Sequence, residues 1–149
     1  MRDKLTDAVY LVVKTLNEQF QKTPGRTEII KLLYLLDLES LKKNGKTLTG
    51  TTYRYHYFGP FSKDILDAIE RLVEEDILED IPEIDHEEGY VKHNYRVLKR
   101  KRISLNEEER RTVTGILKKY GNLPLRELLS VVYNTEPMLE KKKGEVLIG

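Results

Sequence analysis

Residues 29–41 place apolar side chains on almost every side of a helix. At about 100° per residue, the isoleucines and leucines of this stretch point nearly all the way round the helical wheel. They are Ile29, Ile30, Leu32, Leu33, Leu35, Leu36, Leu38 and Leu41. Because a helix that is apolar on most sides must be covered on most sides, we expect it at the centre of the fold. Thr27 is placed to cap this helix, and Asn44-Gly45 is typical of a helix end.

One carboxylate lies within this apolar surface. Asp37 falls between Leu33 and Ile30 on the wheel, so its side chain is predicted to enter the interior. A buried charge needs hydrogen-bond partners, which backbone N–H groups or tyrosine hydroxyls near Gly50 and Tyr53 can supply. We interpret Asp37 as a carboxylate that pins the loop after the helix. The alternative is that it contacts a ligand or a partner.

The remaining periodicity predicts an α+β fold that is mostly helical, with about five helices and a small β-hairpin or sheet. Further helices are expected at residues 5–20, 62–73, 105–120 and 125–133. Ser62 and a capping box at Ser104 and Glu107 predict two helix starts, and Pro137 predicts the last helix end. Extended segments are expected at residues 51–58, 77–84 and 90–98, with a turn at Gly59-Pro60. The central order of helix, extended segment, helix and hairpin resembles a winged helix.

With no repeat and no long linker, we interpret residues 1–138 as one domain and residues 139–149 as a basic C-terminal tail. The triplet Val146–Ile148 of the tail can fold back on the domain or add as a strand to a partner's sheet edge. Tyr53, Tyr55 and Tyr57 share strand parity, which predicts one aromatic face, either a core stripe or an interface.

The composition excludes several classes of protein. The 149 residues contain no cysteine, which excludes disulfides, thiolate zinc sites and cysteine nucleophiles. The N-terminus lacks the apolar core of a secretory signal, and Lys31, Asp37 and Glu39 interrupt the longest apolar-rich run. We therefore expect a cytoplasmic protein that does not enter a membrane.

Patterns of catalytic residues are absent from the sequence, including glycine-rich phosphate loops and nucleophile elbows. One acidic cluster, together with His56 or His93, could supply the ligands of a metal site. The cluster lacks a recognised ligand spacing, so we interpret it as an exposed turn. It comprises Asp85, His86, Glu87 and Glu88. We expect no catalytic residue, no metal and no cofactor.

The charges are segregated although the formal net charge is only +1. Residues 61–89 carry 12 acidic and 2 basic side chains, whereas residues 90–149 carry 14 basic and 7 acidic ones. A basic wing that contacts nucleic acid is the alternative function that this pattern raises. Its candidate contacts are Lys92, Arg96, Lys99, Arg100, Lys101 and Arg102. We favour neutralisation within the hairpin instead, because the facing strand supplies Glu79, Asp80 and Glu83.

Three motifs carry a resemblance to a known family. They are the run KLLYLLD at residues 31–37, then Gly45 with LTGTTY at residues 48–53, and YFGPFS at residues 57–62. In this order and spacing they resemble the SocA-like, or Panacea, antitoxin domain family, most strongly over residues 29–72 and more weakly over residues 125–137. The histidine and tryptophan common near the end of that family are missing, and no separate helix-turn-helix domain precedes the motifs.

The resemblance implies a non-enzymatic protein that binds and neutralises a toxin, usually encoded by a neighbouring gene. One relative also acts as an adaptor that hands its toxin to a protease, so a protease or chaperone is a further partner class, and a homodimer is also considered. The resemblance leaves the identity of the toxin open.

The motif residues are the candidate partner-binding positions. They are Lys31, Tyr34, Asp37, Gly50, Tyr53, Tyr57, Gly59 and Pro60. Glycines here can supply positive φ angles or close approach, and Pro60 can fix a turn. Because Tyr34 is one turn from both Lys31 and Asp37, we expect it to bridge a polar track into the core. Whether these residues are scaffold or contact surface is left open.

Overall fold

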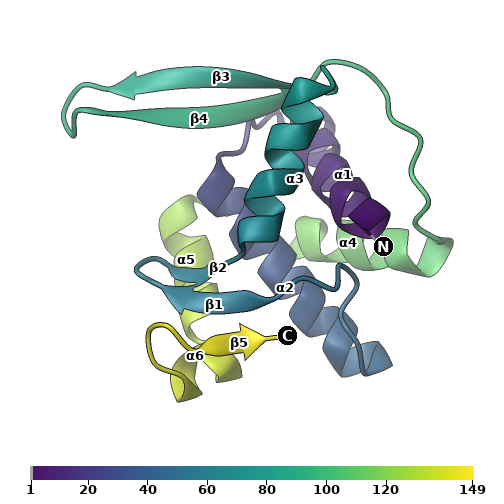
Figure 1. The fold of residues 1–149 in the computed structure, drawn as a ribbon, viewed down its shortest axis with the longest axis vertical. Helices are drawn as coiled ribbons and strands as arrows, with labels where there is room; N and C mark the ends of the chain where they lie inside the picture. Colours follow the sequence, from purple (N-terminus) through teal and green to yellow (C-terminus); the bar gives the residue numbers. More distant parts are fainter. Residues whose placement is uncertain (1) are drawn as a thin grey trace.

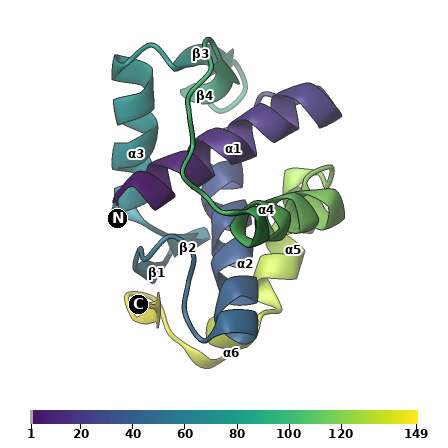
Figure 2. The same ribbon diagram turned by 90° about the vertical axis from the view of Figure 1, so that its right-hand side faces the viewer.

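A central helix organises the molecule. The computed structural model describes residues 2–149, with α2 (Arg26–Asn44) in the middle and α1 (Arg2–Phe20) crossing it (Figures 1 and 2). The helices α4 (Glu107–Tyr120) and α5 (Leu125–Tyr133) also contact α2. Most residues of α2 from Ile29 to Ser40 are buried. The expectation of a central helix is therefore confirmed.

The other elements complete an α+β fold that is mostly helical, as predicted. They are α3 (Lys63–Glu74), α6 (Glu136–Glu140), β1 (Tyr53–His56), β2 (Gly59–Phe61), β3 (Leu78–Asp85), β4 (Tyr90–Val97) and β5 (Val146–Ile148). The described residues thus form six helices rather than five, because α6 was not expected. None of these helices is both long enough and apolar enough to span a membrane.

The predicted hairpin is present and projects from the helical body (Figure 1). β3 and β4 pair antiparallel, and Glu79 lies opposite Arg96 and forms an ion pair with it. His93 lies 2.9 Å from Asp80 on the same pair of strands. At the base of the hairpin, the Val97 N–H donates to Asn17 Oδ1 of α1. Part of the local charge segregation is therefore neutralised across the hairpin, through the Arg96–Glu79 ion pair.

A second small sheet has the strand order β2-β1-β5. Its turn lies at Tyr57-Phe58, so the prediction of a turn at Gly59-Pro60 is wrong by two residues. Pro60 instead lies in β2 at the sheet edge, where its missing N–H removes no ladder bond. The tail folds back, since β5 pairs with β1 and buries Leu147.

Three predicted helix boundaries also differ from the structure. The N-cap of α2 is Gly25 rather than Thr27, and it makes no side-chain cap bond. The capping box of α4 uses Asn106 and Glu109. The predicted box at Ser104 fails because the Ser104 N–H donates to Asp7 at 2.8 Å, which holds that segment against α1. Pro137 lies in the first turn of α6, where proline is tolerated, instead of ending α5. The predicted cap at Ser62 is confirmed.

Candidate functional site

The Asp37 carboxylate is fully buried and fully hydrogen-bonded. Its Oδ1 accepts the N–H groups of Leu48 at 2.8 Å and Thr49 at 3.0 Å. Its Oδ2 accepts the hydroxyls of Thr49 at 2.5 Å and Tyr53 at 2.7 Å. Burial raises the pKa of Asp37, while these four bonds act in the opposite direction. The expected burial and both expected kinds of partner are confirmed, and the carboxylate is not available to a ligand.

The loop that Asp37 holds is shaped by its glycines and hydroxyls. Gly45 ends α2 at φ 75°, and Gly50 follows the Asp37 contacts at φ 76°, a region that favours glycine. Beyond it, Thr51 Oγ1 lies 2.7 Å from Ser62 Oγ, the cap of α3. Asp37 therefore fixes the connection that places β1 and the start of α3. Burial, together with the Asp37 charge, also raises the pKa of Tyr53 well above its ordinary value.

Lys31 is buried without a carboxylate. Only 4% of its surface is exposed, and its ammonium donates to the Pro60 carbonyl at 2.8 Å. No carboxylate of the described chain lies within ion-pair distance of it. Burial lowers the pKa of Lys31 to about 8. The lysine thus ties α2 to β2, but it leaves most of its hydrogen-bonding capacity unused.

Tyr34 does not bridge Lys31 and Asp37, contrary to expectation. Its hydroxyl lies 2.7 Å from Thr135 Oγ1, which donates to the Val132 carbonyl at the end of α5. Its ring meets Tyr53 edge to face, with centroids 5.5 Å apart. Burial raises the pKa of Tyr34. The tyrosine therefore links α2 to the end of α5, because its hydroxyl bonds to Thr135 while Asp37 is occupied by Leu48, Thr49 and Tyr53.

The three tyrosines predicted to share one face, Tyr53, Tyr55 and Tyr57, do not share one environment. Tyr53 is in the core, Tyr55 packs against the core edge, and Tyr57 is 79% exposed because it has entered the turn. Phe58 beside it is 72% exposed. Gly59 follows at φ 94°, and a Cβ there would meet Lys31 and Tyr133 at 3.7 Å. The turn therefore presents two aromatic side chains to solvent above the buried lysine.

The candidate nucleic-acid contacts are separated by the fold. Arg96 pairs with Glu79 on the hairpin. Lys101 donates to the buried Asp7 at 2.6 Å, in the connection that runs across α1 (Figure 2). The remaining candidates lie on the hairpin and on that connection without an ion pair in the described chain, namely Lys92, Lys99, Arg100 and Arg102. The structure does not gather all six on one surface element.

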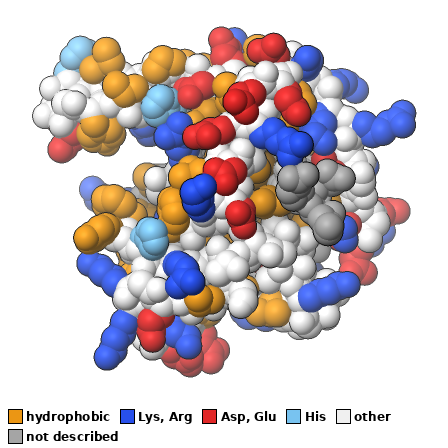
Figure 3. Space-filling model, in the orientation of Figure 1, with side chains coloured by type: hydrophobic (Ala, Val, Ile, Leu, Met, Phe, Trp, Pro, Cys, Tyr) orange, Lys and Arg blue, Asp and Glu red, His pale blue; other side chains and the backbone are white. Residues whose placement is uncertain are grey.

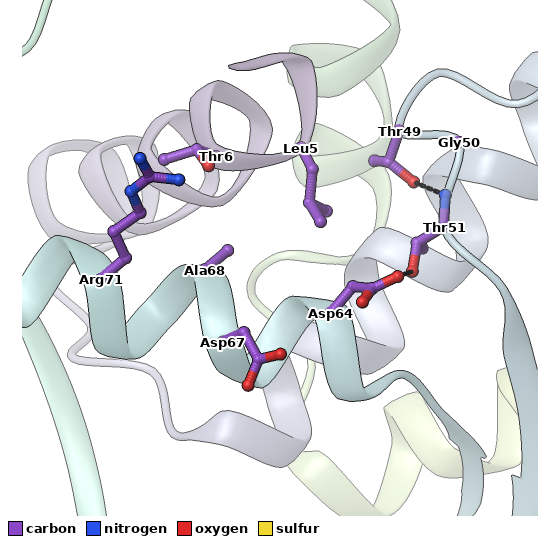
Figure 4. A pocket seen from close by; sticks show the side chains of 9 residues that line it. All are labelled: Leu5, Thr6, Thr49, Gly50, Thr51, Asp64, Asp67, Ala68 and Arg71. Carbon is purple, nitrogen blue, oxygen red and sulfur yellow. Dashed lines mark hydrogen bonds between the residues drawn. The ribbon is translucent and has the colours of Figure 1, made fainter. Parts of the chain in front are cut away.

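One cavity lies between α1, α3 and the loop that follows α2 (Figure 4). Its volume is about 530 Å³, and Asp64, Asp67 and Arg71 line it from α3. Asp64 accepts a hydrogen bond from Thr51 at 3.2 Å. This carboxylate therefore fastens the loop to α3. The lining of the cavity thus consists of a structural contact and of the charged face of α3.

The described residues contain no group of three or more histidine, cysteine, aspartate or glutamate side chains that could hold a metal ion. In the acidic turn, the Asp85 carboxylate accepts the N–H groups of Glu87 and Glu88. His56 stacks on Phe61 at 4.5 Å. These side chains are therefore accounted for by local structure.

Several important residues could not be found from the sequence pattern. Asp7 lies away from the apolar stripe of α1 and is buried only because the connection after β4 covers it. Thr135 was not singled out, although it follows the end of α5 and meets Tyr34. Thr49 is the threonine of the LTG motif, and that motif was the sequence feature that could have indicated its contact with Asp37. These contacts join residues far apart in sequence, and helical periodicity cannot predict such contacts.

Comparison with known proteins places the motif residues in a family. The family model described as Antitoxin SocA-like, Panacea domain matches residues 29–137. This range includes α2 from residue 29 onward, both motif-bearing loops, α3, the hairpin, α4 and α5. No curated protein and no solved structure matches the chain.

Proposed function

Because the chain belongs to the family described as Antitoxin SocA-like, Panacea domain, we propose that it is a non-enzymatic antitoxin that neutralises a protein toxin by direct binding. The match over residues 29–137 is the observation that carries this proposal. The toxin is expected from a neighbouring gene. A cytoplasmic location stays a prediction.

The arrangement of the motif residues supports a binding role. The polar groups of Asp37, Tyr34 and Tyr53 bond within the fold, which supports a scaffold role for these three residues. Next to these contacts, the turn between β1 and β2 exposes two aromatic side chains, Tyr57 and Phe58. Exposed aromatic side chains on an ordered element are typical of protein interfaces.

Co-expression tests the proposal. The neighbouring open reading frame is induced alone, with this chain, and with this gene carrying an early stop codon. We expect growth arrest in the first and third cultures and growth in the second, together with co-purification of the two chains. Arrest that persists beside the intact chain, or rescue by the stop-codon gene, would contradict the proposal.

A role as a proteolytic adaptor is a narrower form of this proposal. It predicts that the half-life of the toxin, after protein synthesis is stopped, is shorter in cells that contain the chain. An unchanged or longer half-life with restored growth would mean neutralisation by binding alone. A chaperone or a second copy of the chain as a further partner stays a prediction.

The alternative of a DNA-binding regulator receives less support from the geometry. Two of its six candidate cations, Arg96 and Lys101, are paired with carboxylates. Helix α3, the position of a reading helix in a winged helix, carries Asp64, Asp67 and Glu70. Duplex binding that weakens steeply with salt, and is lost on replacing Lys99, Arg100 and Arg102 by glutamine, would favour this alternative.

A further inference from the structure

Two cavities meet at the first turn of α2. One, of about 310 Å³, lies between residues 25–28 and the β4 side of the hairpin. The other, of about 320 Å³, lies between α2 and the β1–β2 turn. The two cavities are neighbours, since Arg26 and Thr27 line both of them, and the surface that contains the two is here called the α2 groove. Figure 3 shows the surface hollowed between the projecting hairpin and the lobe formed by the β1–β2 turn.

The walls of the α2 groove carry exposed apolar side chains. Tyr57 and Phe58 line it on the side of the β1–β2 turn. Tyr90 and Val91, about half exposed, line it on the side of the hairpin. Large apolar side chains exposed on both sides of one depression are typical of a surface that a protein partner covers.

The groove is lined by cations without acidic partners. Arg26, Lys31 and Lys92 line it, and no described carboxylate lies within ion-pair distance of any of them. The one acidic residue on the lining, Glu28, pairs with Lys22. The positive end of the α2 dipole lies at the same region, because residues 25–28 line the groove, and Gly25 has no side chain that caps the helix.

Lys31 is the most informative of these cations. It is 96% removed from solvent, yet its ammonium has a single acceptor in the described chain, the Pro60 carbonyl. An ammonium carries three N–H donors, so two have no protein acceptor here. A buried charge with unused donors is costly unless another acceptor reaches it, and an anionic acceptor stabilises the ammonium most. The lysine lines the cavity beside the exposed aromatic turn, where such a group can enter.

We propose that the α2 groove binds a segment of the partner protein in which an acidic side chain lies between apolar or aromatic residues. The carboxylate pairs with Lys31 and Arg26, while its apolar neighbours cover Phe58 and Val91. This inference rests on the proposed function, because it assigns the surface through which the toxin is held. The family match assigns no contact surface, so the groove is argued from the geometry alone.

A protein segment fits this groove better than a nucleic acid. The hairpin that forms one wall carries Glu83, Asp85, Glu87 and Glu88 around its end, and these carboxylates repel a phosphate backbone. A short peptide segment can place one carboxylate in the groove without approaching them.

Binding of the product of the neighbouring gene tests the surface. Calorimetry is performed with the full chain and with Phe58→Ser and Lys31→Met, whose matched controls are Leu139→Ser on α6 and Lys118→Met on α4. Leu139 is 69% exposed, close to the exposure of Phe58, and neither control lines the groove. We expect each groove variant to weaken binding about tenfold or more, and the controls to leave it unchanged. Unchanged affinity in Phe58→Ser, with circular dichroism like that of the wild type, would overturn the groove while leaving the proposed function intact.

A peptide probe tests the groove independently of the toxin. Nuclear magnetic resonance titrations use blocked Leu-Asp-Phe and its matched control Leu-Asn-Phe. We expect shifts at residues 25–31, 57–58 and 90–92, with affinity on the order of millimolar for the aspartate peptide and weaker for the asparagine peptide. Equal responses to both peptides, or shifts elsewhere, would overturn the proposal. The same shifts produced by a single-stranded oligonucleotide, or by raising the protein concentration alone, would assign the groove to nucleic acid or to a second copy and would also overturn it.

If the neighbouring gene product fails to bind the wild-type chain, the proposed function fails for that product. The peptide titration then still decides whether the groove recognises an acidic, apolar-flanked segment. The two failures are therefore distinguishable.

Discussion

At the scale of single residues, α2 buries two opposite charges and treats them differently. Asp37 has four donors around it, from Leu48, Thr49 and Tyr53. Lys31 has one acceptor, the Pro60 carbonyl. The two residues do not pair with each other, since Asp37 is held by the loop after α2 and Lys31 by strand β2. Asp37 is thus a completed structural contact, whereas Lys31 retains the capacity to bind.

Removing the Asp37 carboxylate should destabilise the whole fold. Asp37→Ala leaves buried donors of Leu48, Thr49 and Tyr53 unpaired, and we expect the free energy of unfolding to fall by about 3 kcal/mol or more. Asp37→Asn keeps one acceptor and should lose roughly half as much. Urea unfolding followed by circular dichroism measures both. Unchanged stability in Asp37→Ala would show that these donors find other partners.

Lys31 should make stability depend on pH in the alkaline range. Its pKa falls from the ordinary value of 10.5 to about 8 in the folded chain. Because the folded-state pKa is the lower one, the favourable contribution of Lys31 is complete above pH 10.5 and is lost as the pH falls through about 8. Relative to Lys31→Met, the wild type should therefore gain about 3 kcal/mol between about pH 7.5 and about pH 10.5.

Urea unfolding of both proteins at each pH provides the measurement for Lys31. Taking the difference between wild type and Lys31→Met cancels the titration of the tyrosines, several of which have raised pKa values. A difference that does not vary with pH would mean that Lys31 is solvated or paired in the folded chain.

At the scale of elements, the sequence pattern predicted those parts of the fold that depend on local periodicity. The central α2, the β3–β4 hairpin and the Ser62 cap follow from spacing and residue type within a few turns. The boundaries that differed depend on distant contacts. Ser104 matches a capping box, but its N–H is taken by Asp7 of α1, so α4 starts two residues later.

The candidate site also has one part that the local sequence predicts and another part that depends on distant contacts. The burial of Asp37 and the source of its partners could be predicted, because one carboxylate stood on an apolar helix followed by a glycine-rich loop. The α2 groove could not, since its lining comes from α2, the β1–β2 turn and β4, which meet only in the folded chain. The turn itself shifted to Tyr57-Phe58 because β2 pairs through Gly59 and Pro60.

The position of the α4 cap can be tested by a matched pair of variants. Asn106→Ala removes the acceptor of the Glu109 N–H, and we expect a loss of about 1 kcal/mol in the free energy of unfolding. Ser104→Ala keeps the backbone bond to Asp7 and should change stability by less than about 0.5 kcal/mol. Urea unfolding compares the two. A larger loss for Ser104→Ala would restore the earlier helix start that its capping pattern suggests.

At the scale of the whole molecule, folding rearranges a charge pattern that sums almost to zero. The acidic block of residues 61–89 and the basic block that follows neutralise each other in part, through the ion pair of Arg96 with Glu79. Lys101 is neutralised by Asp7 of α1. The cations left without acidic partners include the three that line the α2 groove, so the surface potential is uneven although the net charge is small.

This unevenness predicts how the complex with the toxin should respond to salt. An acidic segment is attracted towards Arg26, Lys31 and Lys92 before contact, and salt screens that attraction over a distance of about 10 Å at 0.1 M. We expect the association rate constant to fall about tenfold between about 50 mM and about 500 mM sodium chloride, with a much smaller change in the dissociation rate constant. Stopped-flow fluorescence measures the first and surface plasmon resonance the second.

Two variants locate the source of that steering. Lys92→Gln removes an exposed groove cation that has no ion pair in the described chain, so the salt dependence of association should decrease. Lys118→Gln removes a cation of α4 outside the groove and should retain the dependence of the wild type. Because both substitutions lower the net charge by one, an equal effect of the two would mean that the total charge steers the partner. An effect confined to Lys92 instead places the attraction at the groove.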